Sequence, residues 1–378
     1  MSATEDLPDP DRIPGAPHPR ETANVFGQDK AEAEFLEAFN SGRLHSGWMI
    51  TGPQGVGKAT LAYRIATFLL ADRPEDDGLF GAPPPPTTLA IAPDHPDAQL
   101  VRAGSHPRLY RLVRGEGGAN EDSGKLSQTI SVGRVRKLKN FFHMSAADGG
   151  RRVVIVDSVD EMTVAAANAL LKELEEPPAK TTLLLLSHQP SRLLPTIRSR
   201  CRELRCAELG PDDLGQALAQ AGHDIVEAEA LRSLSGGSVG VAIGLLNADG
   251  LALYAELVKL FSGIPNIDRQ AALKLAESCA GKGAEHRFPL TIDLIDHFLS
   301  RAAKAGLLGE PTTQGAAGEA RLLARLSPDD RMARRWADLQ QSLSARVRHG
   351  RAVNLDPAAL ILDMIFKIEE TAKAAART

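Results

Sequence analysis

A glycine-rich run between an apolar segment and a helical segment constrains this 378-residue chain more than any other feature. From Gly52 to Lys58 the sequence is GPQGVGK, which has the G-x-x-x-x-G-K spacing of a P-loop. Glycines there let consecutive backbone N–H groups turn toward phosphate oxygens, and the dipole of the following helix adds to the attraction. Residues 48–50 are predicted to form a strand before the run, and residues 61–70 a helix after it. The pattern predicts a phosphate-binding loop in an α/β domain; a glycine-rich turn without a ligand is the alternative.

The loop lacks one group that P-loop enzymes use for hydrolysis. The position after Lys58 is normally Ser or Thr, whose hydroxyl binds magnesium, but here it is Ala59. Thr60 comes one residue later, and a helix turns its side chain away by about 100°, which makes it a doubtful replacement. Phosphate binding is therefore expected to be retained better than hydrolysis. The candidate nucleotide-binding residues of this segment are Gly52, Gly55, Gly57, Lys58 and Thr60.

A second candidate for the nucleotide site is Asp157, the last residue of the apolar run RVVIVD at 152–157. Ligands of α/β sheets bind at the carboxyl ends of the strands, so a carboxylate there is placed to hold magnesium. The next residue is Ser158, which cannot act as a general base at neutral pH without its own activation. Asp160 and Glu161 lie further along. An ordinary buried strand with a polar end is the alternative.

The most specific segment of the chain is NALLKELEEPP at residues 168–178. Its periodicity predicts an amphipathic helix that two prolines stop. The segment closely resembles a signature of the bacterial clamp-loader family of AAA+ proteins. Other segments agree with this family in the same order, namely VFGQ at 25–28, GRLH at 42–45 and SRC at 199–201. The resemblance covers residues 24–250 and extends to the C-terminal part by position and character only.

The resemblance also implies a role for Arg200 in the SRC segment. In this family the corresponding arginine acts in trans, as an arginine finger on the ATP of a neighbouring subunit. A planar and permanently charged guanidinium suits this role because it can neutralise charge that develops on phosphate. Without the family, a surface arginine near a strand end would be the preferred interpretation.

Three departures from the family pattern indicate which kind of subunit this is. Motor subunits have a hydroxyl after the P-loop lysine, a glutamate after the strand-end aspartate and an arginine in the lid. This chain has Ala59, Ser158 and Gly240 at those positions. With Arg200 kept, the losses predict a non-motor subunit without intrinsic ATPase activity, in the clamp loader of a DNA-directed DNA polymerase (nucleotidyltransferase) holoenzyme.

The implied partners are gamma/tau-like motor subunits and a delta subunit in a hetero-pentamer that loads the sliding clamp onto primed DNA. ATP and Mg²⁺ are expected to bind weakly or without hydrolysis. The competing hypothesis is an active clamp-loader ATPase in which Thr60 and either Asp160 or Glu161 supply the missing groups. A P-loop kinase is a third hypothesis, which the proline-stopped signature helix and the long helical C-terminal part disfavour.

The predicted fold class is α/β followed by all-α. Residues 1–22 are predicted to be a disordered arm, and 23–207 an AAA+ P-loop domain with a parallel sheet. Residues 208–255 are predicted to form a small helical lid domain, and 260–378 a C-terminal helical collar domain for oligomerisation. Within the first domain, residues 71–127 interrupt the alternating pattern. The Pro run at 83–86 and the Gly- and acid-rich stretch at 115–124 are predicted to be loops inserted in the domain.

Composition argues against several other classes of protein, namely disulfide-rich, zinc-binding, membrane-spanning and secreted ones. The cysteines Cys201, Cys206 and Cys279 are too few for a disulfide framework or a four-cysteine zinc site, and His95 and His106 are expected to be loop residues, so no zinc is expected. No apolar run reaches about 18 residues, and no secretory signal is apparent, which predicts a cytoplasmic protein. The net charge of −4 argues against non-specific coating of nucleic acid.

A local basic patch is still compatible with this charge. The predicted helix at 132–143 carries Arg134, Arg136, Lys137 and Lys139, with Arg151 and Arg152 close behind. These side chains could meet DNA phosphates inside a ring of subunits. The solvated side of an amphipathic helix is the preferred alternative.

Overall fold

The computed structural model describes residues 12–71, 84–115, 129–144, 149–223, 227–281, 284 and 286–375. The chain divides into two compact units. The first comprises residues up to 224 together with Gly237–Val241, and the second comprises 225–236 and the chain from Ala242 onward. The predicted lid segment 208–255 therefore contributes to both units, and the three-domain division stays a prediction.

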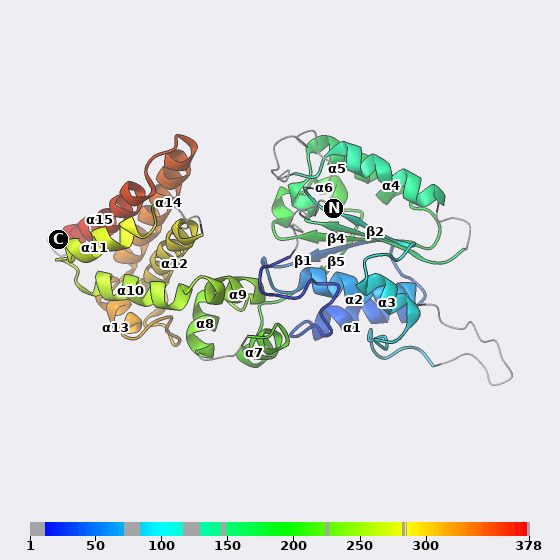
Figure 1. The fold of residues 1–378 in the computed structure, drawn as a ribbon, viewed down its shortest axis with the longest axis horizontal. Coiled ribbons are helices and arrows are strands. Elements are labelled where there is room, and N and C mark those ends of the chain that lie inside the picture. Colours follow the sequence, from blue (N-terminus) through cyan, green and yellow to red (C-terminus); the bar gives the residue numbers. More distant parts are fainter. Residues whose placement is uncertain are drawn as a thin grey trace, which may run out of the picture. The chain divides into compact units, whose positions relative to one another are not determined.

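The first unit contains a five-stranded sheet in which every neighbouring pair is parallel (Figure 1). Its order, β2-β3-β4-β1-β5, places β4 between β3 and β1. The central strands are short runs of Val, Leu and Ile buried on both faces, as parallel sheets require. This confirms the predicted α/β class. The strands are β1 Gly47–Thr51, β2 Leu109–Leu112, β3 Arg152–Asp157, β4 Thr181–Ser187 and β5 Arg202–Arg205.

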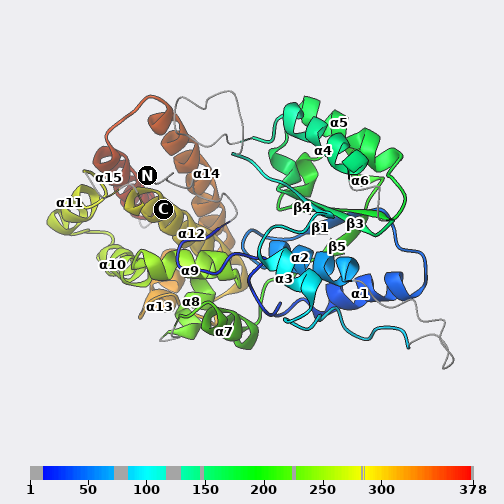
Figure 2. The same cartoon turned by 45° about the vertical axis from the view of Figure 1, so that its right-hand side comes forward.

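Helices cover both faces of this sheet (Figure 2). One face carries α1 Asp29–Asn40, α2 Lys58–Leu70 and α3 Pro96–Arg102, and the other carries α4 Val132–Met144, α5 Val164–Glu175 and α6 Pro195–Arg198. Helix α5 begins where the Thr163 hydroxyl accepts from the Ala166 amide. Two short 3₁₀ helices, η3 Val159–Glu161 and η4 Pro190–Arg192, follow β3 and β4.

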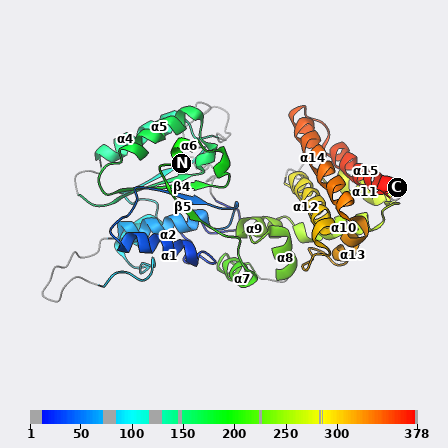
Figure 3. The same cartoon turned by 180° about the vertical axis from the view of Figure 1, so that it is seen from behind.

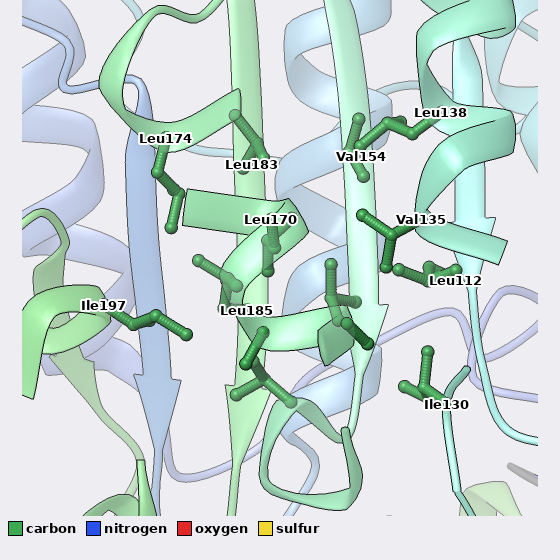
Figure 4. Close-up of a cluster of buried hydrophobic side chains, with 14 of the residues drawn as sticks. Leu112, Ile130, Val135, Leu138, Val154, Leu170, Leu174, Leu183, Leu185 and Ile197 are labelled. Carbon is green, nitrogen blue, oxygen red and sulfur yellow. The ribbon is translucent and has the colours of Figure 1, made fainter. Parts of the chain in front are cut away.

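One hydrophobic cluster packs α4, α5 and α6 against the sheet (Figure 4). Leu138 of α4 and Leu170 of α5 are fully buried against Val154 and Leu185 of the central strands. Burying such a side chain contributes about 1.5–3 kcal/mol. The signature segment up to Glu175 thus belongs to a core helix, and its apolar face determines how the end of α5 lies against the rest of the domain.

Residues 71–127, which interrupt the alternating pattern of the sequence, contain regular structure between the two stretches predicted to be loops. They contain α3 and the edge strand β2, whose residues Leu109 and Leu112 pair with Val153 and Val156 of β3. Only Leu112 of the four β2 residues is buried, so the strand has little apolar signal of its own. Pairing with a distant strand decides its conformation. Residues 72–83 and 116–128 lie outside the described part of the chain.

The predicted disordered arm also differs from the structure. Residues 12–22 form turns on the first unit, and His18 is only 2% exposed. Its ring contacts Tyr63 of α2 edge-on at 5.7 Å between centroids, and its Nδ1 accepts from the Arg20 amide at 3.1 Å. The buried imidazole of His18 is thus one of the contacts that hold a segment whose composition offers few apolar residues. Residues 1–11 lie outside the described part of the chain.

The described residues of the second unit are helices and connecting loops, which agrees with the predicted all-α part (Figure 3). In α15, which spans Pro357–Ala375, Leu360, Ile361, Met364 and Ile365 are buried. The remaining helices of the chain are α7 Pro211–Gln220 in the first unit, α8 Ala228–Ser235, α9 Val239–Asn247, α10 Gly250–Ser262, α11 Arg269–Glu277, α12 Arg287–Leu308, α13 Glu319–Leu326, α14 Asp330–Ala352 and α15 Pro357–Ala375.

Glu319 is a buried charge at the centre of the second unit. It is 0% exposed and accepts from Arg301 Nε at 2.6 Å, the Tyr254 hydroxyl at 2.5 Å and the Gly315 amide at 2.6 Å. These bonds tie α10, α12 and α13 to the loop before α13.

Across the described residues, no single helix has the length and apolarity to cross a membrane, and α9 with α10 meets that test only as a pair bent by 80°.

Candidate nucleotide site

The P-loop lies between β1 and α2, where the sequence predicts it. Gly52, Gly55 and Gly57 all have positive φ values, of 145°, 76° and 98°. L-residues with a side chain rarely adopt this region, so the loop needs glycine at these positions. At Gly52 space is restricted as well, because an added Cβ would lie 2.5 Å from the Cys206 carbonyl oxygen. Gly57 is the N-cap of α2.

Lys58 is folded back on the loop that it follows. Its ammonium group donates to the carbonyl oxygens of Gly52 at 2.9 Å and Pro53 at 2.6 Å, and the residue is only 8% exposed. Burial lowers the Lys58 pKa, while the nearby carboxylates of Asp157 and Asp160 oppose that shift. The loop therefore satisfies its lysine internally, through backbone carbonyls.

The two nucleotide motifs meet at one edge of the sheet. Through the parallel registers, Asp157 lies opposite Leu186 of β4, and Ser187 lies opposite Thr51, the residue before the P-loop. The Ser158 hydroxyl donates to Asp157 Oδ1 at 3.3 Å. The missing groups are not supplied locally, because Ala59 is aliphatic and Thr60 follows it in a regular helix. The arrangement retains phosphate-binding parts but lacks a base directly after Asp157.

Asp160 and Glu161, the proposed substitutes for that base, both have basic neighbours. Asp160 Oδ2 lies 3.1 Å from His188 Nε2, and this carboxylate side chain is 3% exposed. Glu161 lies 3.4 Å from Arg114, and burial raises the pKa of its carboxyl. Sequence reasoning missed His188. Its position directly after β4, at the ligand-binding edge, was the available signal.

Gly240 lies directly against the P-loop. Its amide donates to the Gly55 carbonyl at 3.0 Å, and the Ser238 hydroxyl donates to the Gln54 carbonyl at 2.8 Å. A Cβ added at Gly240 would lie 2.8 Å from Ile13 Cδ1 and 3.0 Å from Gly55 Cα. The position where a motor subunit is expected to have an arginine is therefore a backbone contact with the loop, with no room for a long side chain.

Arg200 lies away from these residues, just before β5. Its carbonyl is next to Gly47, where an added Cβ would lie 3.0 Å from that oxygen. Gly47 begins β1 and the P-loop follows its end. Five strand residues at about 3.3 Å each separate the two points by about 16 Å. Of the predicted site residues, the structure thus brings the P-loop, Asp157 and Gly240 together at the carboxyl ends of the strands. The backbone of Arg200 lies at the other end of β1, beside its first residue.

The two histidines of the insertion have structural contacts. His95 caps α3 by accepting from the Asp97 amide, and the His106 Nε2 atom lies 3.1 Å from Asp97 Oδ1. Cys201, Cys206 and Cys279 are free thiols. Within the described ranges, no group of three or more His, Cys, Asp or Glu side chains could hold a metal ion.

The basic side chains of α4 do not form one surface. Arg136, Lys137 and Lys139 are exposed, whereas Arg134 is half-buried and donates to the Val113 carbonyl. Three cations of this helix are therefore available to solvent, and the fourth helps to hold the chain after β2.

A parallel sheet whose first strand leads into a P-loop motif, and whose third strand ends in an aspartate at the same side of the sheet, defines an α/β domain of the P-loop class. Comparison of the sequence with known protein families shows which P-loop proteins this chain resembles. Residues 27–210 match the family model described as DNA polymerase III, delta subunit. Within it, the chain is similar to DNA polymerase III subunit delta′. The resemblance that the signature helix indicated is confirmed over these residues.

Individual proteins that are similar to this chain are also subunits of DNA polymerase III. The delta′ subunit of Pseudomonas aeruginosa is 37% identical over 233 residues, which cover 61% of this chain and 64% of that protein. The delta′ subunit of Escherichia coli is 33% identical over 57% of this chain and 59% of that protein. DNA polymerase III subunit gamma/tau of Mycobacterium tuberculosis is 29% identical over 53% of this chain and 31% of that protein. The chain thus spans about three fifths of the length of these two delta′ relatives.

Proposed function

We propose that this chain is a delta′-type, non-motor subunit of a DNA polymerase III clamp loader, which supports ATP-driven loading of the sliding clamp onto primed DNA. The position of Arg200 carries the proposal. Its side chain is 37% exposed, and its backbone lies beside the start of β1, about 16 Å from the P-loop of the same chain, which favours a role at a site in another subunit. An arginine finger supplied in trans contributes about 10³–10⁵ in kcat at the site that it completes.

The chain's own nucleotide site fits a subunit that does not turn over ATP. Ala59 and Ser158 remove a magnesium ligand and a base, and Gly240 is hydrogen-bonded to the loop. Gly52, Gly55, Gly57 and Lys58 would hold phosphate if ATP binds, and Asp157 would hold its Mg²⁺. ATP is therefore a weakly bound or non-hydrolysed ligand in this proposal, and no zinc is required.

The proposed partners are gamma/tau-type motor subunits and a delta subunit in a cytoplasmic hetero-pentamer. The relatives named delta′ and gamma/tau support membership of such a complex. Primed DNA is a further proposed contact, through the exposed Arg136, Lys137 and Lys139 of α4.

The test is ATP hydrolysis by a complex reconstituted from this chain with gamma/tau and delta subunits. Arg200→Ala should leave assembly intact and remove the turnover of the motor site that it serves. Arg198→Ala is the matched control, because Arg198 is an exposed arginine two residues earlier. Unchanged turnover with Arg200→Ala would exclude the finger.

An active ATPase is the second candidate, because the P-loop glycines, Lys58 and Asp157 are all in place at one edge of the sheet. The purified chain alone separates the two functions. Mg²⁺-dependent hydrolysis that Lys58→Ala abolishes would establish the second candidate and overturn the first.

A further inference from the structure

The C-terminal end of α5 lies beside Arg200. Glu175, the last residue of α5, accepts from Arg200 Nη2 at 2.7 Å. On the other side of the guanidinium, Nη1 donates to the Thr196 carbonyl at 3.0 Å. Charge-assisted bonds of this length are among the stronger hydrogen bonds in proteins. Both terminal nitrogens of the guanidinium therefore have acceptors within the same chain.

These contacts orient the group without using all of its donors. A guanidinium has five N–H groups in a rigid plane. The bond from Nη2 to Glu175 and the bonds from Nη1 to the Thr196 carbonyl and, at 3.5 Å, to the Ser199 hydroxyl restrain the rotation of that plane. They leave further N–H groups for another acceptor. Arginine otherwise loses considerable rotamer freedom when it binds, and a side chain that is already held loses less.

The position of Glu175 follows from the packing of the signature helix. The preceding residue, Leu174, is 5% exposed in the hydrophobic cluster, together with Ile197 of α6. A Cβ added at Gly47 would lie 3.0 Å from both Leu174 Cδ2 and the Arg200 carbonyl oxygen. The end of α5, the start of β1 and the backbone of Arg200 therefore meet at one point. Core packing places Glu175 at the side chain of Arg200.

The pair itself remains open to solvent. The Arg200 and Glu175 side chains are 37% and 47% exposed. Ion pairs at this exposure add little to folding stability, so a role in holding the fold is a poor explanation for the contact. The exposure also leaves the guanidinium accessible to a partner.

We propose that Glu175 is a positioning residue for Arg200, restraining the orientation in which the guanidinium meets a phosphate of the neighbouring subunit. The inference rests on the proposed trans-acting role of Arg200. It also assigns a task to the glutamate that ends the signature helix: α5 packs through Leu174 and presents Glu175 to the finger.

The experiment is steady-state ATP hydrolysis by the reconstituted complex with Glu175→Ala or Glu175→Gln. Glu175→Ala should cause most of the kcat loss that Arg200→Ala causes, with an unchanged KM for ATP, because a misoriented group loses transition-state contacts rather than ground-state binding. Glu175→Gln keeps a neutral acceptor and should lose less. Glu176→Gln is the control, since Glu176 is exposed and adjacent. Assembly, measured by size-exclusion chromatography, should be unchanged throughout.

A second arm separates positioning from a structural effect. In the Arg200→Ala background, Glu175→Ala should cause no further loss of kcat, because the group that it positions is gone. A wild-type kcat for Glu175→Ala, an equal loss with Glu176→Gln, or an additive loss in the double variant would each overturn the inference. If Arg200→Ala itself has no effect, the proposed function fails first. If only the Glu175 variants have no effect, this inference alone fails.

Discussion

Gly55 of the P-loop and Gly240 of the lid segment lie back to back. The Gly240 amide donates to the Gly55 carbonyl at 3.0 Å, and a Cβ added at Gly55 would lie 3.0 Å from both the nitrogen and the Cα of Gly240. At position 240, where the family resemblance predicts an arginine in a motor subunit, glycine makes a close backbone contact with the loop. Two glycines allow this contact because neither has a side chain to separate the two segments.

This contact predicts unequal costs for alanine within the loop. Gly55→Ala and Gly57→Ala both force a side chain into the left-handed region, which costs about 1–2 kcal/mol. Only Gly55→Ala also overlaps the Ser238 hydroxyl and the backbone of Gly240, whereas an added Cβ at Gly57 has nothing within 4 Å. Overpacking adds about 1–3 kcal/mol, so Gly55→Ala should be the more destabilising variant in urea unfolding. Equal losses would show that position 240 does not press on the loop.

A second prediction concerns the buried charge of the helical unit. Glu319→Ala leaves Arg301, whose side chain is 13% exposed, without its carboxylate partner. Breaking one side of a buried ion pair costs about 3–5 kcal/mol, and chemical denaturation should show a loss of that size. Asp330→Ala removes the exposed pair with Arg334 and should cost less than about 1 kcal/mol. Similar costs for both variants would contradict the assigned role of Glu319.

The pH dependence of stability should depend in part on His297. Burial is the main cause that lowers its pKa from 6.5 to about 4, and the positive charge of Arg301 adds to the shift. Between pH 6.5 and about 4 the unfolded chain binds the proton and the folded chain does not, so stability falls as pH falls. At pH 5 the loss relative to pH 7 is about 2 kcal/mol from this group.

Urea unfolding at the two pH values checks this expectation. His297→Gln should remove this part of the pH dependence, and His286→Gln, at an exposed position, should leave it unchanged. The same slope between pH 5 and pH 7 in wild type and His297→Gln would show that His297 titrates normally in the folded chain.

The N-terminal segment provides a fourth prediction. His18→Ala removes the ring contact with Tyr63 and the acceptor of the Arg20 amide. An unsatisfied buried group costs about 1–3 kcal/mol, and residues 12–22 should detach before the rest of the unit. Hydrogen exchange of these amides should accelerate in His18→Ala while β3 and β4 stay protected. Unchanged exchange would mean that other contacts hold the segment.

The strongest local patterns predicted the fold correctly. The runs at 152–157 and 183–186 are central strands, and α5, Val164–Glu175, is a core helix, because long apolar faces select one secondary structure by themselves. Weak patterns failed: β2 has one buried residue, and residues 12–22 depend on His18. Their conformations come from contacts with distant segments, which local composition does not encode.

For the candidate site, too, the sequence predicts some features and the tertiary structure decides others. The sequence by itself determined which residue types stand at the candidate site, because each is a residue type at a fixed spacing: the glycines and lysine of the P-loop motif, the aspartate at the strand end, Ala59, Ser158, Gly240 and Arg200. Their roles stay predictions. Only the tertiary structure decided what these residues contact: Gly240 on Gly55, and Glu175 on Arg200. These pairs are separated by 185 and 25 positions in the chain. Their meeting depends on how the sheet and helices pack, and no local pattern specifies that distance.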